Sequence, residues 1–196
     1  MSFIGKSLAL DVDGVLMECY PPINARIVEK FDVPSDFRIQ RIARSWNLTE
    51  LPEDIRLYAL ALMAEADIVE QYTFKKGSKK FVKELYDCVT NNGGQFIFNT
   101  HCLNEEVGKV RRKQLETLSK YLGIEPIYNI SVGPTKVNAE SDIIIDDHKG
   151  NLDVSPATTK ILFSMFHNRN LKAEDAFRSN DYNEIVRIVR EVVANA

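Results

Sequence analysis

Two acidic residues, one position apart, close the first apolar run of the chain and give its clearest signal of chemistry. Asp11 and Asp13 follow the apolar residues 8–10 and stand just before Gly14. At the end of a strand, two such carboxylates can converge on one metal ion or one phosphate, and Gly14 lets the backbone turn sharply away. The pair alone is weak evidence, because acidic residues are common at strand ends and in turns.

Further polar residues follow this acidic pair in a fixed order. Thr100 comes after a second apolar run, Lys136 lies further along, and Asp146 and Asp147 directly follow the apolar residues 143–145. In a parallel α/β sheet, ligands bind at the carboxyl ends of the strands. The two acidic pairs and Thr100 each stand at the end of a predicted strand, and Lys136 lies in the connection before the last one. We therefore expect all of them at one edge of the sheet.

The residue types in this set predict a metal ion beside a phosphate group. Carboxylates alone suit a hard cation such as Mg²⁺, which takes oxygen ligands. A lysine and a threonine beside them suit phosphate oxygens, since lysine brings a point charge and threonine a hydroxyl donor. The metal ion and Lys136 would together allow an anionic carboxylate to approach an anionic phosphoryl group.

The elements that must position these residues are those of an α/β protein. Short, continuous apolar runs are typical of buried parallel strands, and they are expected at residues 7–12, 95–99, 126–130, 141–145 and 160–163. Helical patterns at residues 78–91, at 104–122 and from 181 onward separate several of these runs. This alternation predicts a doubly wound, mainly parallel sheet.

Residues 18–76 interrupt the alternation of strands and helices. The segment contains three helical stretches, no convincing strand and prolines at several boundaries, and its apolar residues at 55–63 are dense enough for a helix buried on several sides. We therefore expect a small helical cap inserted after the first strand. The predicted division is an α/β core at 1–17 and 77–196, with the cap at 18–76.

Composition limits the classes of partner. The chain has 196 residues and a net charge of −3, which argues against binding to a nucleic-acid polymer, because such binding usually needs a marked basic excess. Cys19, Cys88 and Cys102 lack C-x-x-C spacing and are expected to be reduced thiols. No run approaches the ~18 apolar residues of a membrane span, and no signal-peptide pattern precedes the first strand. We expect a complete, soluble, cytoplasmic protein without a membrane partner.

Four segments resemble the motifs of the haloacid dehalogenase (HAD) phosphatases: residues 11–15, residues 98–100, Lys136 and residues 143–147. The resemblance covers the whole chain and narrows to the 5′(3′)-deoxyribonucleotidases, the cytosolic type C nucleotidases. The spacing from Lys136 to Asp147, the stretch 161–168 and a closing helix from Asp181 point to that family. It implies a HAD-like fold and a Mg²⁺-dependent phosphomonoesterase that acts on a small phosphate ester, a deoxyribonucleoside monophosphate.

The resemblance also implies a role for each motif carboxylate. Asp11 would be the nucleophile that forms an aspartyl-phosphate. Asp13 would protonate the leaving ester oxygen and then deprotonate the water that hydrolyses the intermediate. Mg²⁺ would be held by the carboxylate of Asp11, the backbone carbonyl of Asp13 and Asp147. Asp146 would position Lys136 or a metal-bound water rather than bind the metal directly.

The remaining implied residues contact the substrate. Thr100, His101 and Lys136 would hold the phosphoryl oxygens. His101 stands where the family usually has a small hydroxyl side chain, and His148 where a lysine or arginine is common. Aromatic residues of the cap would line the pocket for the rest of the substrate, the first candidates being Tyr20, Trp46 and Phe74.

The sequence leaves alternatives open. The protein could instead be a HAD phosphatase of another metabolite, such as a sugar phosphate or phosphoglycolate, or a catalytically idle HAD-like binding protein, which the complete set of motif residues disfavours. Base, sugar, 5′ or 3′ position and assembly are not determined, and a homodimer is compatible with the chain. Two basic clusters are interpreted as solvated helix faces: Arg38, Arg41 and Arg44, and Lys109, Arg111, Arg112 and Lys113.

Overall fold

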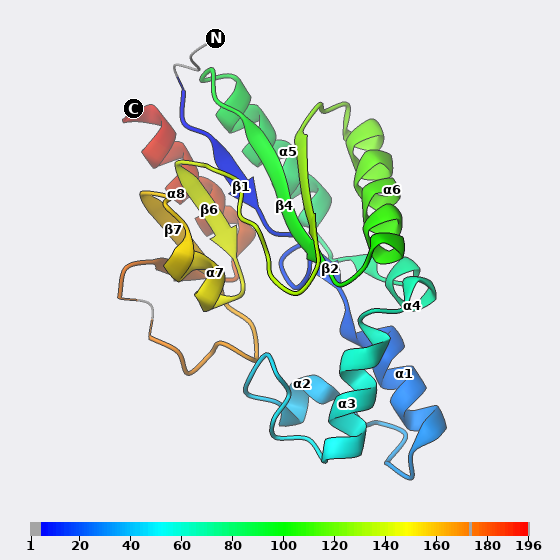
Figure 1. Ribbon diagram of the computed structural model, residues 1–196. Coiled ribbons are helices and arrows are strands. Elements are labelled where there is room, and N and C mark those ends of the chain that lie inside the picture. The colour runs from blue at the N-terminus through cyan, green and yellow to red at the C-terminus, as the bar shows by residue number, and fades with distance from the viewer. Residues whose placement is uncertain (1–4, 173, 196) are drawn as a thin grey trace.

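A six-stranded parallel sheet forms the centre of the protein (Figure 1). The computed structural model describes residues 5–172 and 174–195. Across the sheet the strands follow the order β5 (Ile127–Val132), β4 (Phe96–Cys102), β1 (Leu8–Leu10), β6 (Ile143–Asp146), β7 (Thr159–Phe163) and β8 (Phe177–Ser179). Every neighbouring pair is parallel. The predicted α/β fold with a mainly parallel sheet is confirmed.

The first strand lies in the middle of the sheet and is buried on both faces. Leu8 pairs with Phe96 on one side and with Ile143 on the other, and the same register continues to Leu10. Helices or connecting segments cover both faces of the sheet, so apolar residues are needed at every position of these strands. This explains why the apolar runs in the sequence are continuous. This register brings the ends of β1, β4 and β6 to one edge of the sheet.

The two faces carry different amounts of helix. The helices α5 (Ser78–Thr90), α6 (Glu105–Leu122) and α8 (Tyr182–Ala194) pack on one face and contribute to the main hydrophobic core. The short helix α7 (Lys149–Val154) covers the other face, where a small apolar cluster consists of Ala9, Ile144, Leu152, Ala157 and Leu162. Helices on both faces make the sheet doubly wound, as the sequence predicted.

Local signals explain where the longest helix begins and ends. The side chain of Asn104 accepts a hydrogen bond from the Val107 N–H, which caps the N-terminus of α6. At the other end, Gly123 has φ of 62°, a left-handed conformation in which glycine avoids steric strain. Both residues were recognisable in the sequence, and the helix falls within one residue of its predicted bounds.

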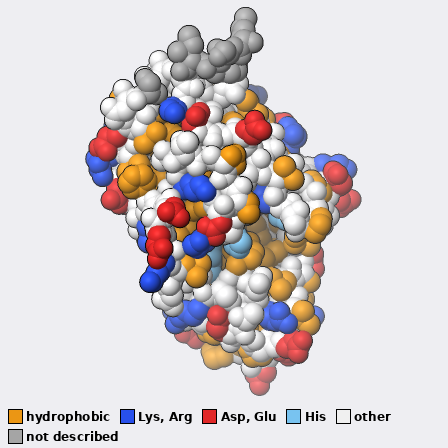
Figure 2. Space-filling view, turned by 60° about the vertical axis from the view of Figure 1, so that its left-hand side comes forward, with side chains coloured by type: hydrophobic (Ala, Val, Ile, Leu, Met, Phe, Trp, Pro, Cys, Tyr) orange, Lys and Arg blue, Asp and Glu red, His pale blue; other side chains and the backbone are white. Residues whose placement is uncertain are grey.

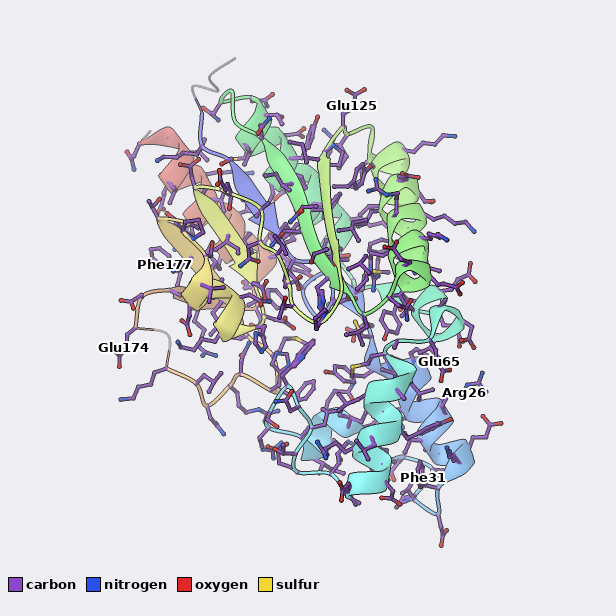
Figure 3. The ribbon with its side chains drawn as sticks, in the orientation of Figure 1. Arg26, Phe31, Glu65, Glu125, Glu174 and Phe177 are labelled. Atoms are coloured by element: carbon purple, nitrogen blue, oxygen red, sulfur yellow. The ribbon has the colours of Figure 1, made fainter. Side chains whose placement is uncertain are left out.

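A helical insertion, defined here as residues 20–70, follows the first strand. It contains α1 (Tyr20–Lys30), α2 (Ile39–Ile42), α3 (Glu53–Leu62) and α4 (Ala66–Glu70). Figure 1 shows α1, α2 and α3 below the carboxyl ends of the strands, with α4 between them and α6. The interior of the insertion is apolar: Phe31, which follows α1, packs edge-on against Tyr58 of α3, far from the sheet (Figure 3).

Several elements differ from the sequence prediction. Among the described residues the insertion has four helices rather than three, and two short strands, β2 (Met17–Glu18) and β3 (Thr73–Phe74), pair antiparallel at its base. The strand β8 and the helix α7 were not predicted either. Elements of two to six residues contain too little periodic pattern to be recognised, and their pairing with distant segments stabilises them. The strand β4 also extends to Cys102, so Thr100 lies within it.

Candidate active site

The predicted acidic residues converge at the carboxyl edge of the sheet. The Asp11 N–H donates to the Ile145 carbonyl at 2.9 Å, which continues the pairing of β1 and β6 just past the end of β1. Asp146 is the last residue of β6, and Asp147 follows it. Carboxylate oxygens of Asp11, Asp146 and Asp147 all lie within 4.8 Å of one another, and all three residues are buried. The register of β1 and β6 brings Asp11 to the adjacent residues Asp146 and Asp147.

Lys136 bridges two of these three carboxylates. Its Nζ lies 2.5 Å from Asp11 Oδ1 and 2.7 Å from Asp146 Oδ2, and its side chain is buried. Asp146 also accepts hydrogen bonds from the His148 N–H and from Asn151 Nδ2. Both oxygens of Asp146 are therefore occupied. This arrangement suits a residue that positions Lys136.

An asparagine network fixes the segment that carries Lys136. Asn129 Nδ2 donates to Asn99 Oδ1 at 2.7 Å and to the Val137 carbonyl at 2.8 Å. Asn99 Oδ1 also accepts from the Ala139 N–H, and Asn99 Nδ2 donates to Asn138 Oδ1. Asn99 itself is fully buried in β4. The connection between β5 and β6 is thus tied to the sheet directly after Lys136.

The buried charges of the cluster are incompletely balanced. Burial raises the pKa of Asp11 to about 7, Lys136 opposes this rise, and the neighbouring carboxylates add to it. Burial, followed by the charges of Asp11 and Asp146, raises the pKa of Asp147 well above its usual value. Burial would lower the pKa of Lys136, but the two carboxylates that it contacts raise it overall. When ionised, the three carboxylates outnumber the single ammonium group of Lys136, so a bound cation would improve the charge balance of the cluster.

Asp147 is held by its backbone while its side chain stays available. The Asp147 carbonyl accepts hydrogen bonds from Asn168 Nδ2 at 2.7 Å and from His167 Nε2 at 3.1 Å. Burial lowers the pKa of His167 to about 4, which keeps its ring neutral. Within the described part of the chain, Asp147 Oδ2 is buried and has no hydrogen-bond partner. Such an atom costs free energy unless a ligand satisfies it.

Gly14 creates the space that Asp147 occupies. Its φ is 75°, and a Cβ atom there would lie 1.9 Å from Asp147 Oδ2. The Gly14 carbonyl accepts a hydrogen bond from Lys75 Nζ. Burial lowers the pKa of Lys75, although Glu18 and Asp147 oppose the change. The tight turn after β1 is therefore shaped by Gly14 and held by Lys75, which follows β3. Only the glycine could be recognised in the sequence.

Thr100 and His101 lie on β4 and line the same cavity as the acidic cluster. Thr100 is fully buried, and in the described residues its Oγ1 has no hydrogen-bond partner. The His101 ring contacts the Gly133 carbonyl through Nε2 at 2.6 Å. Thr100 therefore has an unpartnered hydroxyl in the lining of the site. One ring nitrogen of His101, in contrast, already contacts the connection that leads to Lys136.

Asp13 points toward an arginine that the sequence analysis placed elsewhere. Arg111 Nη2 lies 2.5 Å from Asp13 Oδ1, and the Arg111 side chain is 1% exposed. The interpretation of Arg111 as part of a solvated basic face is wrong, although its neighbours Lys109, Arg112 and Lys113 are exposed as expected. On α6, Arg111 falls on the apolar face with Val107, Leu115 and Leu118. The helical spacing of Arg111 relative to these apolar residues could have indicated its burial, but the sequence analysis grouped it with the neighbouring basic residues.

A cavity of about 910 Å³ opens over the predicted catalytic residues. Residues at the ends of the strands form its floor, and the helical insertion contributes Tyr20, Trp46, Leu60, Met63 and Val69. Figure 2 shows histidine side chains in a hollow between the two parts of the molecule, with hydrophobic side chains around them. Of the three predicted aromatic residues, Tyr20 and Trp46 line the cavity, whereas Phe74 lies on β3 outside its lining.

Trp46 connects the helical insertion to the sheet edge. Its ring makes edge contacts with His148 at 5.7 Å and with His167 at 5.1 Å between ring centroids. Both histidines belong to segments that follow β6 and β7. Trp46 remains 38% exposed, so part of its ring surface is open to a ligand in the cavity.

The donor set fits a hard divalent cation such as Mg²⁺. Asp11 and Asp147 offer carboxylate oxygens, and the unpartnered Oδ2 of Asp147 lacks a ligand within the residues described. Oxygen ligands and several negative charges are the surroundings that Mg²⁺ prefers. A bound cation would also offset the burial of these charges, because it stabilises their ionised forms. The buried acidic cluster can thus hold the metal ion that the sequence analysis expected.

Comparison with known proteins agrees with this geometry. The model of the family described as 5′ nucleotidase, deoxy (pyrimidine), cytosolic type C protein (NT5C) matches residues 6–196, nearly the whole chain. No curated protein matches the chain significantly. In the described part of the chain, none of the helices has the length and apolar character needed to span a membrane. By its fold, its carboxyl-edge acidic site and this match, the chain belongs to the cytosolic type C 5′-nucleotidases, hydrolases of phosphoric monoesters with a HAD-type fold.

Proposed function

We propose that the protein is a Mg²⁺-dependent deoxyribonucleotidase that hydrolyses nucleoside monophosphates through an aspartyl-phosphate on Asp11. The observation that carries this proposal is the convergence of Asp11, Lys136 and Thr100 beneath one cavity. A carboxylate, an ammonium group and an unpartnered hydroxyl are the groups that in-line phosphoryl transfer needs. The family match supports a nucleotide as the substrate.

In the first half of the reaction, a carboxylate oxygen of Asp11 forms a bond to phosphorus while the ester P–O bond breaks. Asp13 gives its proton to the leaving alkoxide oxygen, which departs as the nucleoside hydroxyl. Lys136 and Thr100 bind the phosphoryl oxygens and stabilise the charge that they carry in the transition state. Lys136 already contacts Asp11, so the same ammonium group can bring nucleophile and phosphate together.

In the second half, a water molecule attacks the aspartyl-phosphate and restores the Asp11 carboxylate. Asp13, now ionised, takes the proton from that water, and inorganic phosphate is released. The Asp11 carboxylate, the Asp13 backbone carbonyl and Asp147 would hold Mg²⁺. When bound, the metal ion neutralises phosphate charge and polarises the phosphoryl oxygens. Asp146 keeps Lys136 in place throughout.

The rest of the substrate would bind beneath the helical insertion, for which we propose the role of a cap over residues 18–76. Apolar and aromatic side chains dominate the walls that the insertion supplies. Such surfaces suit a planar base, and one base stacked on an aromatic ring gains roughly 1–3 kcal/mol. A sugar phosphate or phosphoglycolate would leave these walls uncovered, so the cavity favours a nucleotide over the alternative metabolites.

Phosphate release from a panel of nucleotides and sugar phosphates, with and without Mg²⁺, tests the proposal. We expect turnover of deoxyribonucleoside monophosphates that requires the metal ion. Equal turnover of nucleotides and unrelated phosphates would contradict the nucleotide assignment and would leave a general phosphatase.

The nucleophile is tested separately by Asp11→Asn. The amide is a poor nucleophile and a poor metal ligand, but it is nearly isosteric, so the variant should fold and lose activity. Thermal unfolding checks the fold, and activity close to that of the wild type would exclude the aspartyl-phosphate mechanism. Asp153→Asn serves as the control, because Asp153 is exposed and pairs with Lys149 instead.

A further inference from the structure

Arg111 stands out because a buried charge needs a reason to be there. It is the largest fully buried side chain in the described residues, and it comes from α6 rather than from a strand end. Buried arginines are rare unless they are paired, because removing a guanidinium from water is costly. The partner of Arg111 is Asp13, 98 positions away in the sequence.

Several groups hold the Arg111 guanidinium in one orientation. Nη1 lies 2.8 Å from Gln114 Oε1 and 2.6 Å from Met17 Sδ, and the ring of Tyr72 lies 5.5 Å from the guanidinium carbon. Gln114 in turn donates through Nε2 to the Val69 carbonyl at the end of α4. The guanidinium is therefore fixed by packing and by hydrogen bonds, as a residue that orients another group must be.

Arg111 acts on one oxygen of Asp13 and leaves the other available. Oδ1 accepts from Arg111 Nη2 at 2.5 Å and from Cys19 Sγ at 3.3 Å. Within the described chain, Oδ2 accepts no hydrogen bond, and Asp13 lines the cavity. A general acid needs one carboxyl oxygen free to carry the proton and a fixed carboxyl plane to aim it.

We propose that Arg111 is the positioning residue for Asp13: it anchors Oδ1 so that Oδ2 faces the leaving oxygen of the substrate. This inference rests on the proposed role of Asp13 as general acid and base. Because α4 and α6 hold the guanidinium through Gln114, the helical insertion contributes to the geometry of proton transfer as well as to the substrate pocket.

Two substrates that differ in how much their leaving group needs a proton test the proposed role of Arg111. Phenyl phosphate and p-nitrophenyl phosphate have nearly the same shape, but p-nitrophenolate leaves with little need of a proton. For both substrates, kcat/KM reports the first half of the reaction. If Arg111 aims Asp13, Arg111→Met should lower kcat/KM on the order of 100-fold for a nucleotide and for phenyl phosphate, the scale of losing general acid catalysis. For p-nitrophenyl phosphate we expect a loss of less than about 5-fold.

Matched variants separate positioning from folding and from phosphate binding. Arg112→Met removes a neighbouring, half-exposed arginine of α6 and should change none of these ratios. Arg111→Lys keeps the charge and one donor and should restore part of the lost nucleotide activity. The inhibition constant of inorganic phosphate should stay unchanged in Arg111→Met, because the arginine contacts Asp13 rather than phosphate. Thermal unfolding establishes that each variant is folded.

Equal losses for phenyl and p-nitrophenyl phosphate, with weaker inhibition by phosphate, would overturn the proposal and make Arg111 a phosphate ligand. If Arg111→Met does not fold, Gln114→Leu provides the decision, since it removes one hydrogen bond of the guanidinium and keeps the ion pair. It should produce a smaller loss with the same dependence on the leaving group, and a uniform loss would again overturn the proposal. Failure of the wild type to hydrolyse any nucleotide would instead contradict the proposed function.

Discussion

Lys136 is the residue that links two buried carboxylates of the site. Its ammonium group contacts Asp11 and Asp146, both buried, so it neutralises charges that water cannot reach. Removing one member of a buried ion pair is costly because the other member stays behind uncompensated. The same contacts that place Lys136 for its proposed role as a phosphate ligand therefore also contribute to the stability of the protein.

Lys136→Ala should consequently affect both stability and catalysis. We expect the free energy of unfolding, measured by chemical denaturation without Mg²⁺, to fall by about 3–5 kcal/mol. In the folded variant, KM should rise and kcat should fall, because in the proposed mechanism the lysine binds phosphate in both the ground state and the transition state. Lys149→Ala is the control: its pair with Asp153 is exposed, so the change should stay below about 1 kcal/mol. Equal effects of the two variants would contradict the assigned role of Lys136.

Among the structural elements, the turn after β1 determines how closely the ends of β1 and β6 approach each other in the site. Gly14 lies against the Asp147 carboxylate, and the antiparallel β2 and β3 pair that follows brings Lys75 back to the Gly14 carbonyl. The site thus depends on contact between two strand ends and on a short antiparallel strand pair at the base of the helical insertion. A side chain at position 14 would have to displace Asp147.

Gly14→Ala should therefore inactivate the enzyme through geometry. Misplacing a catalytic group by about 1 Å can cost 10²-fold in rate, and we expect a loss of at least that order. Gly123→Ala is the matched control, because Gly123 also has a left-handed φ, of 62°, but no neighbouring atom within 4 Å. It should lower stability by roughly 1–2 kcal/mol and leave kcat/KM unchanged. If both variants kept full activity, close approach of Gly14 to Asp147 would not be a requirement.

At the scale of the whole molecule, a metal ion bound to the acidic cluster would balance its buried charges and thereby stabilise the folded protein. The acidic cluster gathers residues from β1 and β6, so a cation bound there stabilises the folded chain only when those strands are paired. Ligands that bind the native state alone raise its stability by mass action. Thermal unfolding can therefore detect the metal site without any measurement of activity.

Addition of Mg²⁺ should raise the melting temperature of the wild type. At a free Mg²⁺ concentration about 100 times Kd, the stabilisation should be about 2.7 kcal/mol. Asp147→Asn should abolish the shift because it removes the negative charge of the carboxylate and replaces one of its oxygens by an amide nitrogen, whereas Asp153→Asn should preserve it. An undiminished shift in Asp147→Asn would move the metal site away from the sheet edge.

The helical insertion and the sheet meet around the cavity, where Trp46 contacts His148 and His167. We expect Trp46→Ala to weaken nucleotide hydrolysis about 5- to 150-fold in kcat/KM, which corresponds to roughly 1–3 kcal/mol of base stacking. The effect on p-nitrophenyl phosphate should be smaller. Leu57→Ala, an exposed apolar residue of α3 outside the cavity lining, serves as the control. An equal loss for both substrates would exclude Trp46 as a determinant of specificity.

The sequence by itself determined the parallel sheet, the ends of α6 and the identity of the strand-end residues. These features depend on local information: continuous apolar runs, the capping Asn104, the terminal Gly123 and polar residues that directly follow buried strands. Because parallel strands share one edge, Asp11 and Asp146 could be placed together before any contact between them was known.

The tertiary structure alone decided which surrounding side chains reach the site. Arg111 and Asp13 are 98 positions apart, and only the packing of α6 against the sheet turns one member of a basic cluster into a buried partner. The tertiary structure also decided among the aromatic candidates that the sequence offered, because Tyr20 and Trp46 line the cavity and Phe74 does not. A side chain's residue type shows what it can bind, but its neighbours depend on how distant segments pack, and no local pattern records that packing.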